Sequence, residues 1–292
     1  MCNLCGNMTN GKVIKNSISS VYSRSRGQLY KLIECSECKV LQTFPFPTEL
    51  ELLEIYSNDY SYEYHDAVIV EKSNRAKSIL RLILRHAPTD EILEFGSGSG
   101  VLLNEAYKLG LKVTGVELSE KAGNVLSIGS DVKLVNDSAE NFLMSATSLP
   151  DTIVLSHTLE HFLKPEELLS SIYDKLPWQG TLVLVVPNNR NILRKFRSRY
   201  WGYWQVPVHT YHFNHDSLKS LLLKTGFIPK RTFYRSGDFL SKGLFVTNLL
   251  NISSSKLPGR ELMWLVKVLS SLWFLAYKFG RSDLILIAKK SS

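Results

Sequence analysis

Three glycines and two acidic residues form a pattern suited to a nucleotide-like ligand. Glu94 to Gly100 reads Glu-Phe-Gly-Ser-Gly-Ser-Gly, where the apolar stretch of residues 91–95 gives way to a helical pattern. Glycines at such a turn let the backbone approach a ligand, which the amides of the helix start then face. Glu117 ends the next strand-like stretch, where its carboxylate can accept hydrogen bonds from both hydroxyls of a ribose. Val101 stands where a dinucleotide fingerprint has Gly or Ala, which argues against NAD and FAD.

A second cluster, Ser156 to His161, follows a strand-like stretch at residues 152–156. Open α/β sheets bind ligands at the carboxyl ends of their strands. One interpretation makes His157 a general base, with Glu160 and His161 lining the site in the next turn. A second makes His157, Glu160 and His161 a divalent-metal site at i, i+3 and i+4. A zinc peptidase motif needs a long helix, which a proline soon afterwards disfavours. The remaining interpretation is structural, with side chains that only orient the loop.

The four cysteines form two Cys-x-x-Cys pairs, Cys2 with Cys5 and Cys35 with Cys38. Four thiolates suit a tetrahedral Zn²⁺ ion, and such a closed site leaves no coordination position for chemistry. We therefore expect a structural zinc site, with four reduced cysteines that hold no metal as the alternative. A redox role is disfavoured because neither pair opens a helix after a strand.

Strand and helix patterns alternate from residue 91 onward, which predicts an α/β fold with a sheet covered on both faces. We expect a Rossmann-like, seven-stranded, doubly wound sheet with a small zinc-ribbon-like module before it. The expected strands are 91–95, 112–118, 131–135, 152–156, 181–186, 231–234 and 284–288, and the expected helices are 102–109, 120–127, 138–144, 165–176 and one around 218–222. The predicted domains are a four-cysteine zinc-binding module at 1–48, a connector and amphipathic helix at 49–89 that could act as a lid, and a catalytic domain at 90–292 with a helical insertion at about 237–281.

From about Asp90 to Lys290 the sequence resembles the class I S-adenosylmethionine (SAM) dependent methyltransferases. The resemblance implies that residues 94–100 contact the methionine part of SAM, that Glu117 binds the ribose, and that Leu118 lies beside the adenine. Asp137 would meet the adenine amino group. Trp178 and Gln179 depart from the usual turn before the fifth strand, away from the pocket. The implied cofactor-binding residues are Glu94, Gly96, Ser97, Gly98, Gly100, Glu117, Leu118, Asp137, Ser138, Ala139 and Ser156.

The same resemblance draws attention to the histidine-rich segment 208–217, which precedes a helix. Many related methyltransferases have a histidine in this loop, which faces the acceptor, so His209 becomes a second candidate base. The candidate catalytic residues are therefore His157, His209 and His161. His215 or Asp216 is expected to cap the following helix.

The amino-terminal half resembles methyltransferases of surface-polysaccharide and deoxysugar biosynthesis, because two Cys-x-x-Cys pairs precede Pro-x-Pro and a tyrosine-rich segment. Sugar C-methyltransferases of that group have a further carboxy-terminal domain that this sequence lacks. We therefore expect SAM-dependent O-methylation of a sugar, or of a small or lipid-linked glycan precursor. The alternatives are an RNA methyltransferase that uses the zinc module and a basic patch, and a non-catalytic SAM-binding protein. The fourth strand lacks the Asn/Asp-Pro-Pro-aromatic motif of base-amino methylation.

The net charge of +8 and the pI of about 9.2 are compatible with a polyanionic partner such as RNA or a lipid headgroup. Segment 190–204 combines arginines with aromatic residues, and segment 262–279 is apolar except for a narrow polar stripe. The second segment is interpreted either as a packed helix or as an interfacial membrane helix. The first residues do not resemble a secretory signal, which predicts a cytoplasmic protein. If segments 190–204 and 262–279 bind lipid, the protein would also make peripheral contact with the inner face of the membrane. The oligomeric state is not predicted.

Overall fold

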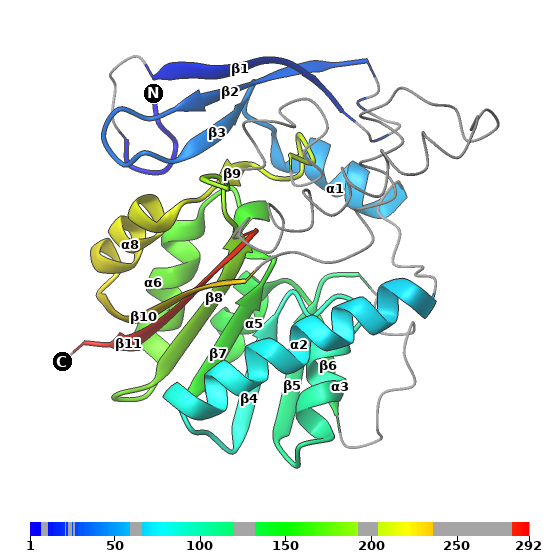
Figure 1. Ribbon diagram of the computed structural model, residues 1–292, viewed down its shortest axis with the longest axis vertical. Coiled ribbons are helices and arrows are strands. Elements are labelled where there is room, and N and C mark those ends of the chain that lie inside the picture. The colour runs from blue at the N-terminus through cyan, green and yellow to red at the C-terminus, as the bar shows by residue number, and fades with distance from the viewer. Residues whose placement is uncertain are drawn as a thin grey trace, which may run out of the picture.

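Seven strands form the larger of two sheets, in the order β10-β11-β8-β7-β4-β5-β6 (Figure 1). The computed structural model describes residues 1–6, 11–20, 22, 25, 27–58, 66–119, 132–191, 204–235 and 282–291. The strands from β6 to β8 run parallel, whereas β11 runs antiparallel to both β8 and β10. Their bounds are β4 Glu91–Phe95, β5 Lys112–Glu117, β6 Lys133–Asn136, β7 Thr152–Ser156, β8 Thr181–Pro187, β10 Phe227–Arg235 and β11 Asp283–Lys290. The predicted doubly wound sheet is therefore confirmed.

Helices cover both faces of this sheet. Alternate side chains of each strand point to opposite faces, so both faces have apolar side chains that helices bury. Leu93 and Phe95 pack with α5, α6 and α8, whereas Ile92 packs with α2 and α3. All seven residues of β8 are buried, as expected for a central strand covered on both faces. The helix bounds are α2 Asp66–His86, α3 Val101–Tyr107, α5 Ala139–Ser145, α6 Pro165–Lys175 and α8 His215–Lys224.

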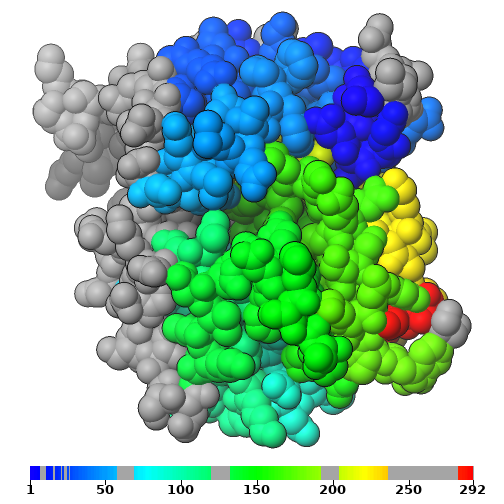
Figure 2. Space-filling view, turned by 180° about the vertical axis from the view of Figure 1, so that it is seen from behind, coloured from blue at the N-terminus to red at the C-terminus, as the bar shows by residue number. Residues whose placement is uncertain are grey.

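A smaller antiparallel sheet in the order β1-β2-β3-β9 lies across one end of the larger one (Figure 1). Its first three strands are β1 Lys12–Ser19, β2 Leu29–Glu34 and β3 Leu41–Phe44, and helix α1 follows at Glu49–Asn58. The fourth strand, β9 Tyr211–His212, comes from the histidine-rich segment and pairs with Leu41 and Gln42. Figure 2 shows the amino-terminal residues, in blue, lying against the green part of the chain, which belongs to the region of the larger sheet. The segment predicted as acceptor-facing is therefore also a strand of the amino-terminal sheet.

Some expectations differ in detail or fall outside the described residues. The cap of α8 is Asn214, whose side chain accepts hydrogen bonds from the amides of Asp216 and Ser217, so the expectation of His215 or Asp216 was wrong. Strand β10 starts earlier than expected because the antiparallel pairing with β11 extends it. The helix expected at 120–127, most of segment 190–204, and the insertion at about 237–281 with segment 262–279 lie outside the described residues. Among the described residues, no helix is long and apolar enough to cross a membrane.

Candidate functional site

The glycine turn after β4 has a backbone that ordinary residues rarely adopt. Gly96, Gly98 and Gly100 have φ angles of 66°, 52° and 73°. A Cβ atom on Gly96 would overlap the Cγ2 atom of Thr158, so the turn packs closely against the segment that follows β7. Glycine is needed here both for its backbone freedom and for its lack of a side chain.

We expect Gly96→Ala to lose stability through strain and overlap, by about 1–3 kcal/mol from the backbone alone. Gly110→Ala is the matched control, because Gly110 also has a positive φ of 81° but no atom within 4 Å of its Cβ position. Thermal unfolding should show the larger loss for Gly96→Ala. Equal losses in the two variants would contradict the close contact between the turn and Thr158.

The carboxylate of Glu117 links the ends of β4 and β5. Its Oε2 atom accepts a hydrogen bond of 2.8 Å from the amide of Gly98, and its Oε1 atom accepts one of 3.0 Å from the amide of Ser119. The next residue, Leu118, is 50% exposed, as expected for a side chain that could lie against a flat ligand. Glu117 is thus held at the carboxyl edge of the sheet beside the glycine turn, where the sequence predicted a ribose-binding acid.

The residues after β6 form the next part of this edge. The Oδ1 atom of Asp137 accepts hydrogen bonds from the Ser138 amide at 2.8 Å and from Asn141 Nδ2 at 3.0 Å. The Ser138 side chain caps α5, and Ala139 is buried in its first turn. Asp137 therefore has a fixed orientation, while Ser138 and Ala139 have local roles in starting the helix.

Two buried polar groups beside the glycine turn lack hydrogen-bond partners among the described residues. These are Glu94 Oε2 and Ser97 Oγ, in side chains that are almost fully buried. Burial and the nearby Glu117 carboxylate raise the pKa of Glu94 well above its usual value. Buried polar atoms usually have partners, so these two fit a polar ligand held by the turn. The residues here fit the sugar and amino-acid ends of SAM.

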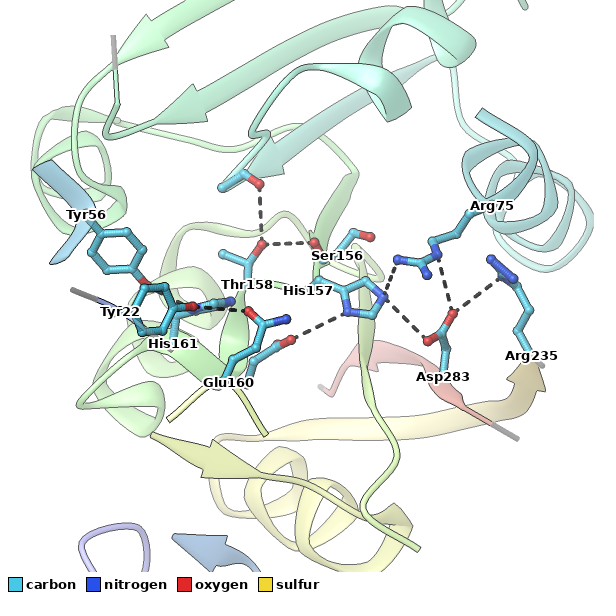
Figure 3. Close-up of polar contacts among 12 residues, drawn as sticks. Tyr22, Tyr56, Arg75, Ser156, His157, Thr158, Glu160, His161, Arg235 and Asp283 are labelled. Atoms are coloured by element: carbon cyan, nitrogen blue, oxygen red, sulfur yellow. Dashed lines mark hydrogen bonds and ion pairs between the residues drawn. The ribbon is translucent and has the colours of Figure 1, made fainter. Parts of the chain in front are cut away.

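A histidine lies at the carboxyl end of β7, next to Ser156 and Thr158. His157 has a φ of 56°, and its ring lies between two carboxylates (Figure 3). Its Nδ1 atom is 3.6 Å from Glu160 Oε1, and its Nε2 atom is 3.7 Å from Asp283 Oδ1. The hydroxyl of Thr158 lies 3.5 Å from the carbonyl of Gly96. His157 is therefore next to the glycine turn, where a base for methyl transfer would be needed.

Three charged residues near His157 were not found from the sequence. Asp283 starts β11 and is fully buried, 3.7 Å from the Nε atom of Arg75 in α2 and 3.5 Å from that of Arg235 in β10. Arg75 Nη1 also lies 3.3 Å from His157 Nε2. These residues are far apart in the chain and follow no local motif, so only the fold brings them together.

The other two candidate histidines, His161 and His209, lie close to Glu160 and to each other. One ligand atom each from Glu160, His161 and His209 lies within 4.8 Å of the others. The rings of His161 and His209 are perpendicular, with centroids 4.7 Å apart. His157 is not in this group, so the expected set of His157, Glu160 and His161 is corrected: residues 159–161 form a single 3-10 turn, and the His157 ring turns toward Asp283. That short turn also removes the helix that a zinc peptidase motif requires.

Burial and the neighbouring ionisable groups shift the pKa values of Glu160 and His161. Burial alone would raise the pKa of the Glu160 carboxyl, but the neighbouring His157, His161 and His209 lower it to about 2. Burial lowers the pKa of His161 despite the nearby Glu160 carboxylate. Glu160 is thus an ionised carboxylate at neutral pH.

The amino-terminal sheet reaches into this part of the site. Thr43 in β3 donates a hydrogen bond of 2.7 Å from its hydroxyl to the carbonyl of His209. The hydroxyl of Tyr56 in α1 lies 2.8 Å from His161 Nδ1. Residues 1–58 therefore help to position two of the three candidate catalytic histidines.

The four cysteine sulfurs converge at the end of this sheet where β1 begins and β2 turns into β3, all within 4.8 Å of one another. The Cys2 and Cys38 sulfurs are 3.8 Å apart, and those of Cys5 and Cys35 are 3.6 Å apart. Four thiolates at about 2.3 Å from a tetrahedral zinc would have sulfurs about 3.8 Å apart. The donor set and spacing fit Zn²⁺, and no disulfide is formed.

Residues 70–228 match a protein-family model that is described as a methyltransferase domain. The chain belongs to this methyltransferase family. The match spans the glycine turn, Glu117 and the histidine cluster. A search of curated proteins found none that matches this methyltransferase.

Solved structures agree on the fold of the methyltransferase. A SAM-dependent methyltransferase from Archaeoglobus fulgidus is 21% identical with a TM-score of 0.51, covering 77% of this chain and 100% of its own. One from Thermotoga maritima is 18% identical with a TM-score of 0.52, covering 82% of this chain and 99% of its own. The 1,6-didemethyltoxoflavin-N1-methyltransferase of Burkholderia thailandensis is 15% identical with a TM-score of 0.54, covering 97% of this chain and 100% of its own. The methyltransferase thus has the fold of SAM-dependent methyltransferases.

Glu117→Ala tests the donor end of this site. Removing the carboxylate leaves the Gly98 amide without its acceptor and removes the predicted ribose contact. We expect SAM binding to weaken by about 1–3 kcal/mol, the usual cost of an unpaired buried polar group. Isothermal titration would measure the change. Glu91→Ala is the control, since Glu91 is exposed at the start of β4. Equal SAM affinities for the two variants would count against ribose binding by Glu117.

Proposed function

We propose that this methyltransferase transfers the methyl group of SAM to a hydroxyl of a sugar, or of a small or lipid-linked glycan precursor. The observation that carries the proposal is the position of His157, beside the glycine turn and between two carboxylates. A hydroxyl acceptor must lose a proton as it is methylated, and an imidazole is suited to accept it. The sequence resemblance to polysaccharide and deoxysugar methyltransferases supports a sugar as the acceptor.

The proposed reaction is an in-line displacement at a methyl carbon that bound SAM supplies. The acceptor oxygen forms a bond to this carbon as the carbon–sulfur bond breaks, and the bonding electrons stay on sulfur. His157 takes the proton from the acceptor hydroxyl. The glycine turn and Glu117 hold the donor in place, so that alignment and exclusion of water account for much of the rate.

The four cysteines are proposed to hold a structural zinc ion. The spacing of the sulfurs and the choice of donors support this assignment. Such an ion would join the segment before β1 to the turn between β2 and β3, at one end of the amino-terminal sheet, and through β3 and β9 it would stabilise the backbone at His209. Its role would be to position the acceptor side of the site.

A transfer assay with methyl-labelled SAM tests the proposal. Purified protein would be incubated with nucleotide sugars, simple glycosides and lipid-linked sugars, with a structured RNA as the competing acceptor. We expect label in a carbohydrate, with an O-methyl group identified by NMR. Label in RNA alone, or on a carbon or nitrogen atom of the acceptor, would contradict the proposed reaction.

A further inference from the structure

The carboxylate of Glu160, which faces the His157 ring, is buried and lacks hydrogen-bond donors among the described residues. Glu160 is 1% exposed, and neither of its carboxylate oxygens has a hydrogen-bond partner among the described residues. The distance from Oε1 to His157 Nδ1 is 3.6 Å, which is longer than a hydrogen bond. Burying an ionised carboxylate is costly unless a cation or donors compensate for it. Glu160 therefore points to a positively charged ligand.

Two imidazoles lie where such a ligand would bind. One nitrogen each from His161 and His209 lies within 4.8 Å of the other and of a Glu160 oxygen. Ligand atoms about 2.1 Å from a common ion are about 3–4 Å apart, so small side-chain movements would close this triangle. Glu160 and His209 are both almost fully buried, which shields the site from bulk water.

The surrounding structure holds these three residues in place. The Glu160 carbonyl accepts hydrogen bonds of 3.0 Å from both the amide and the hydroxyl of Thr210, which ties the turn after β7 to the segment that carries His209. The His209 carbonyl accepts a hydrogen bond from the hydroxyl of Thr43. The Tyr56 hydroxyl contacts His161 Nδ1, the kind of outer contact that orients a metal-binding imidazole and leaves Nε2 for the ion.

We propose that Glu160, His161 and His209 bind a divalent metal ion at the acceptor side of the site, separate from the four cysteines. Two imidazoles and one carboxylate suit Zn²⁺, Fe²⁺, Co²⁺ or Mn²⁺ better than the all-oxygen sites of Mg²⁺ and Ca²⁺. Three protein ligands leave coordination positions for water or for an acceptor oxygen, whose proton the ion would make more acidic. His209 is then a ligand, which leaves His157 as the base. This role in catalysis rests on the proposed function, whereas binding of the ion does not.

The test measures bound metal in the full-length protein. Wild type and variants would be loaded with Zn²⁺, separated from excess ion by gel filtration, and analysed by plasma mass spectrometry. Glu160→Gln and His209→Ala are expected to hold one zinc ion fewer than wild type. His157→Ala and the surface variant His215→Ala should hold as much as wild type. Loss of an ion in His157→Ala, or full occupancy in His209→Ala, would overturn the assignment.

A spectroscopic measurement on wild-type protein removes any dependence on how the variants fold. Co²⁺ added to protein whose cysteines already hold Zn²⁺ should give visible d–d bands without the charge-transfer band of a thiolate ligand. Absence of these bands, or a charge-transfer band that places the ion at the cysteines, would contradict the site. Titration with SAM on the same samples reports on the proposed function separately, because the three residues lie outside the predicted donor pocket.

Discussion

Replacing His157 with alanine is expected to lower kcat about 10²- to 10⁴-fold, the usual contribution of a general base. The ring lies at the end of β7, next to the segment that contacts Gly96, and carboxylates on both sides orient it. Because it lies outside the glycine turn and the Glu117 contact, the Kd for SAM should change little. Steady-state transfer to the acceptor, together with calorimetry for SAM, would separate the two effects.

The matched control for this experiment is His215→Ala. His215 is partly exposed at the start of α8 and contacts Asp216, away from the site, so its loss should leave kcat unchanged. His209→Ala tests the other candidate base from the sequence. Turnover at the wild-type rate in both His157→Ala and His209→Ala would remove the assignment of either residue as the base.

Replacing Cys35 with serine is expected to have the second large effect. Structural zinc sites in small peptides contribute on the order of 10 kcal/mol of folding free energy, so loss of one thiolate should unfold much of the amino-terminal sheet. Strand β3 would then no longer pair with β9 or hold the His209 carbonyl. We expect one zinc ion fewer than wild type, a lower thermal stability, and a loss of turnover that exceeds any loss of SAM affinity.

Glu37→Ala serves as the control for Cys35→Ser. Glu37 is an exposed residue between the two cysteines of the second pair, so it probes the same turn without removing a ligand. Zinc content, unfolding temperature and turnover should all match wild type in this variant. A Cys35→Ser protein with wild-type zinc content and turnover would contradict a structural zinc that positions His209.

Local sequence patterns were sufficient to predict the larger sheet and the adjacency of the glycine turn and Glu117. Apolar strand and helix patterns alternate regularly, and the sheet formed from them is buried on both faces. The glycine turn and Glu117 are adjacent because the carboxyl ends of neighbouring parallel strands meet at one edge, so the order of strands is enough to bring them together. The spacing of the Cys-x-x-Cys pairs likewise predicted that the four sulfurs would converge.

The acceptor end could not be predicted in the same way, because it depends on contacts between distant segments. Spacing of i, i+3 and i+4 suggested that His157, Glu160 and His161 share a helical face, but residues 159–161 form a short 3-10 turn and His157 has a positive φ. The His157 ring therefore lies between Glu160 and Asp283, and His209 takes the third place in the group with Glu160 and His161. His209 joins Glu160 through contacts between distant segments: Thr210 donates hydrogen bonds to the Glu160 carbonyl, and Thr43 donates one to the His209 carbonyl. Strand β9 has two residues, too few to show a periodic pattern.

Calorimetric titration of purified wild-type protein with SAM and with S-adenosylhomocysteine tests whether the glycine turn and Glu117 bind SAM. We expect saturable binding of both ligands to one site per chain, weakened in Glu117→Ala and unchanged in Glu91→Ala. If neither ligand gives a heat signal or raises the unfolding temperature of correctly folded protein, the proposed donor site is wrong.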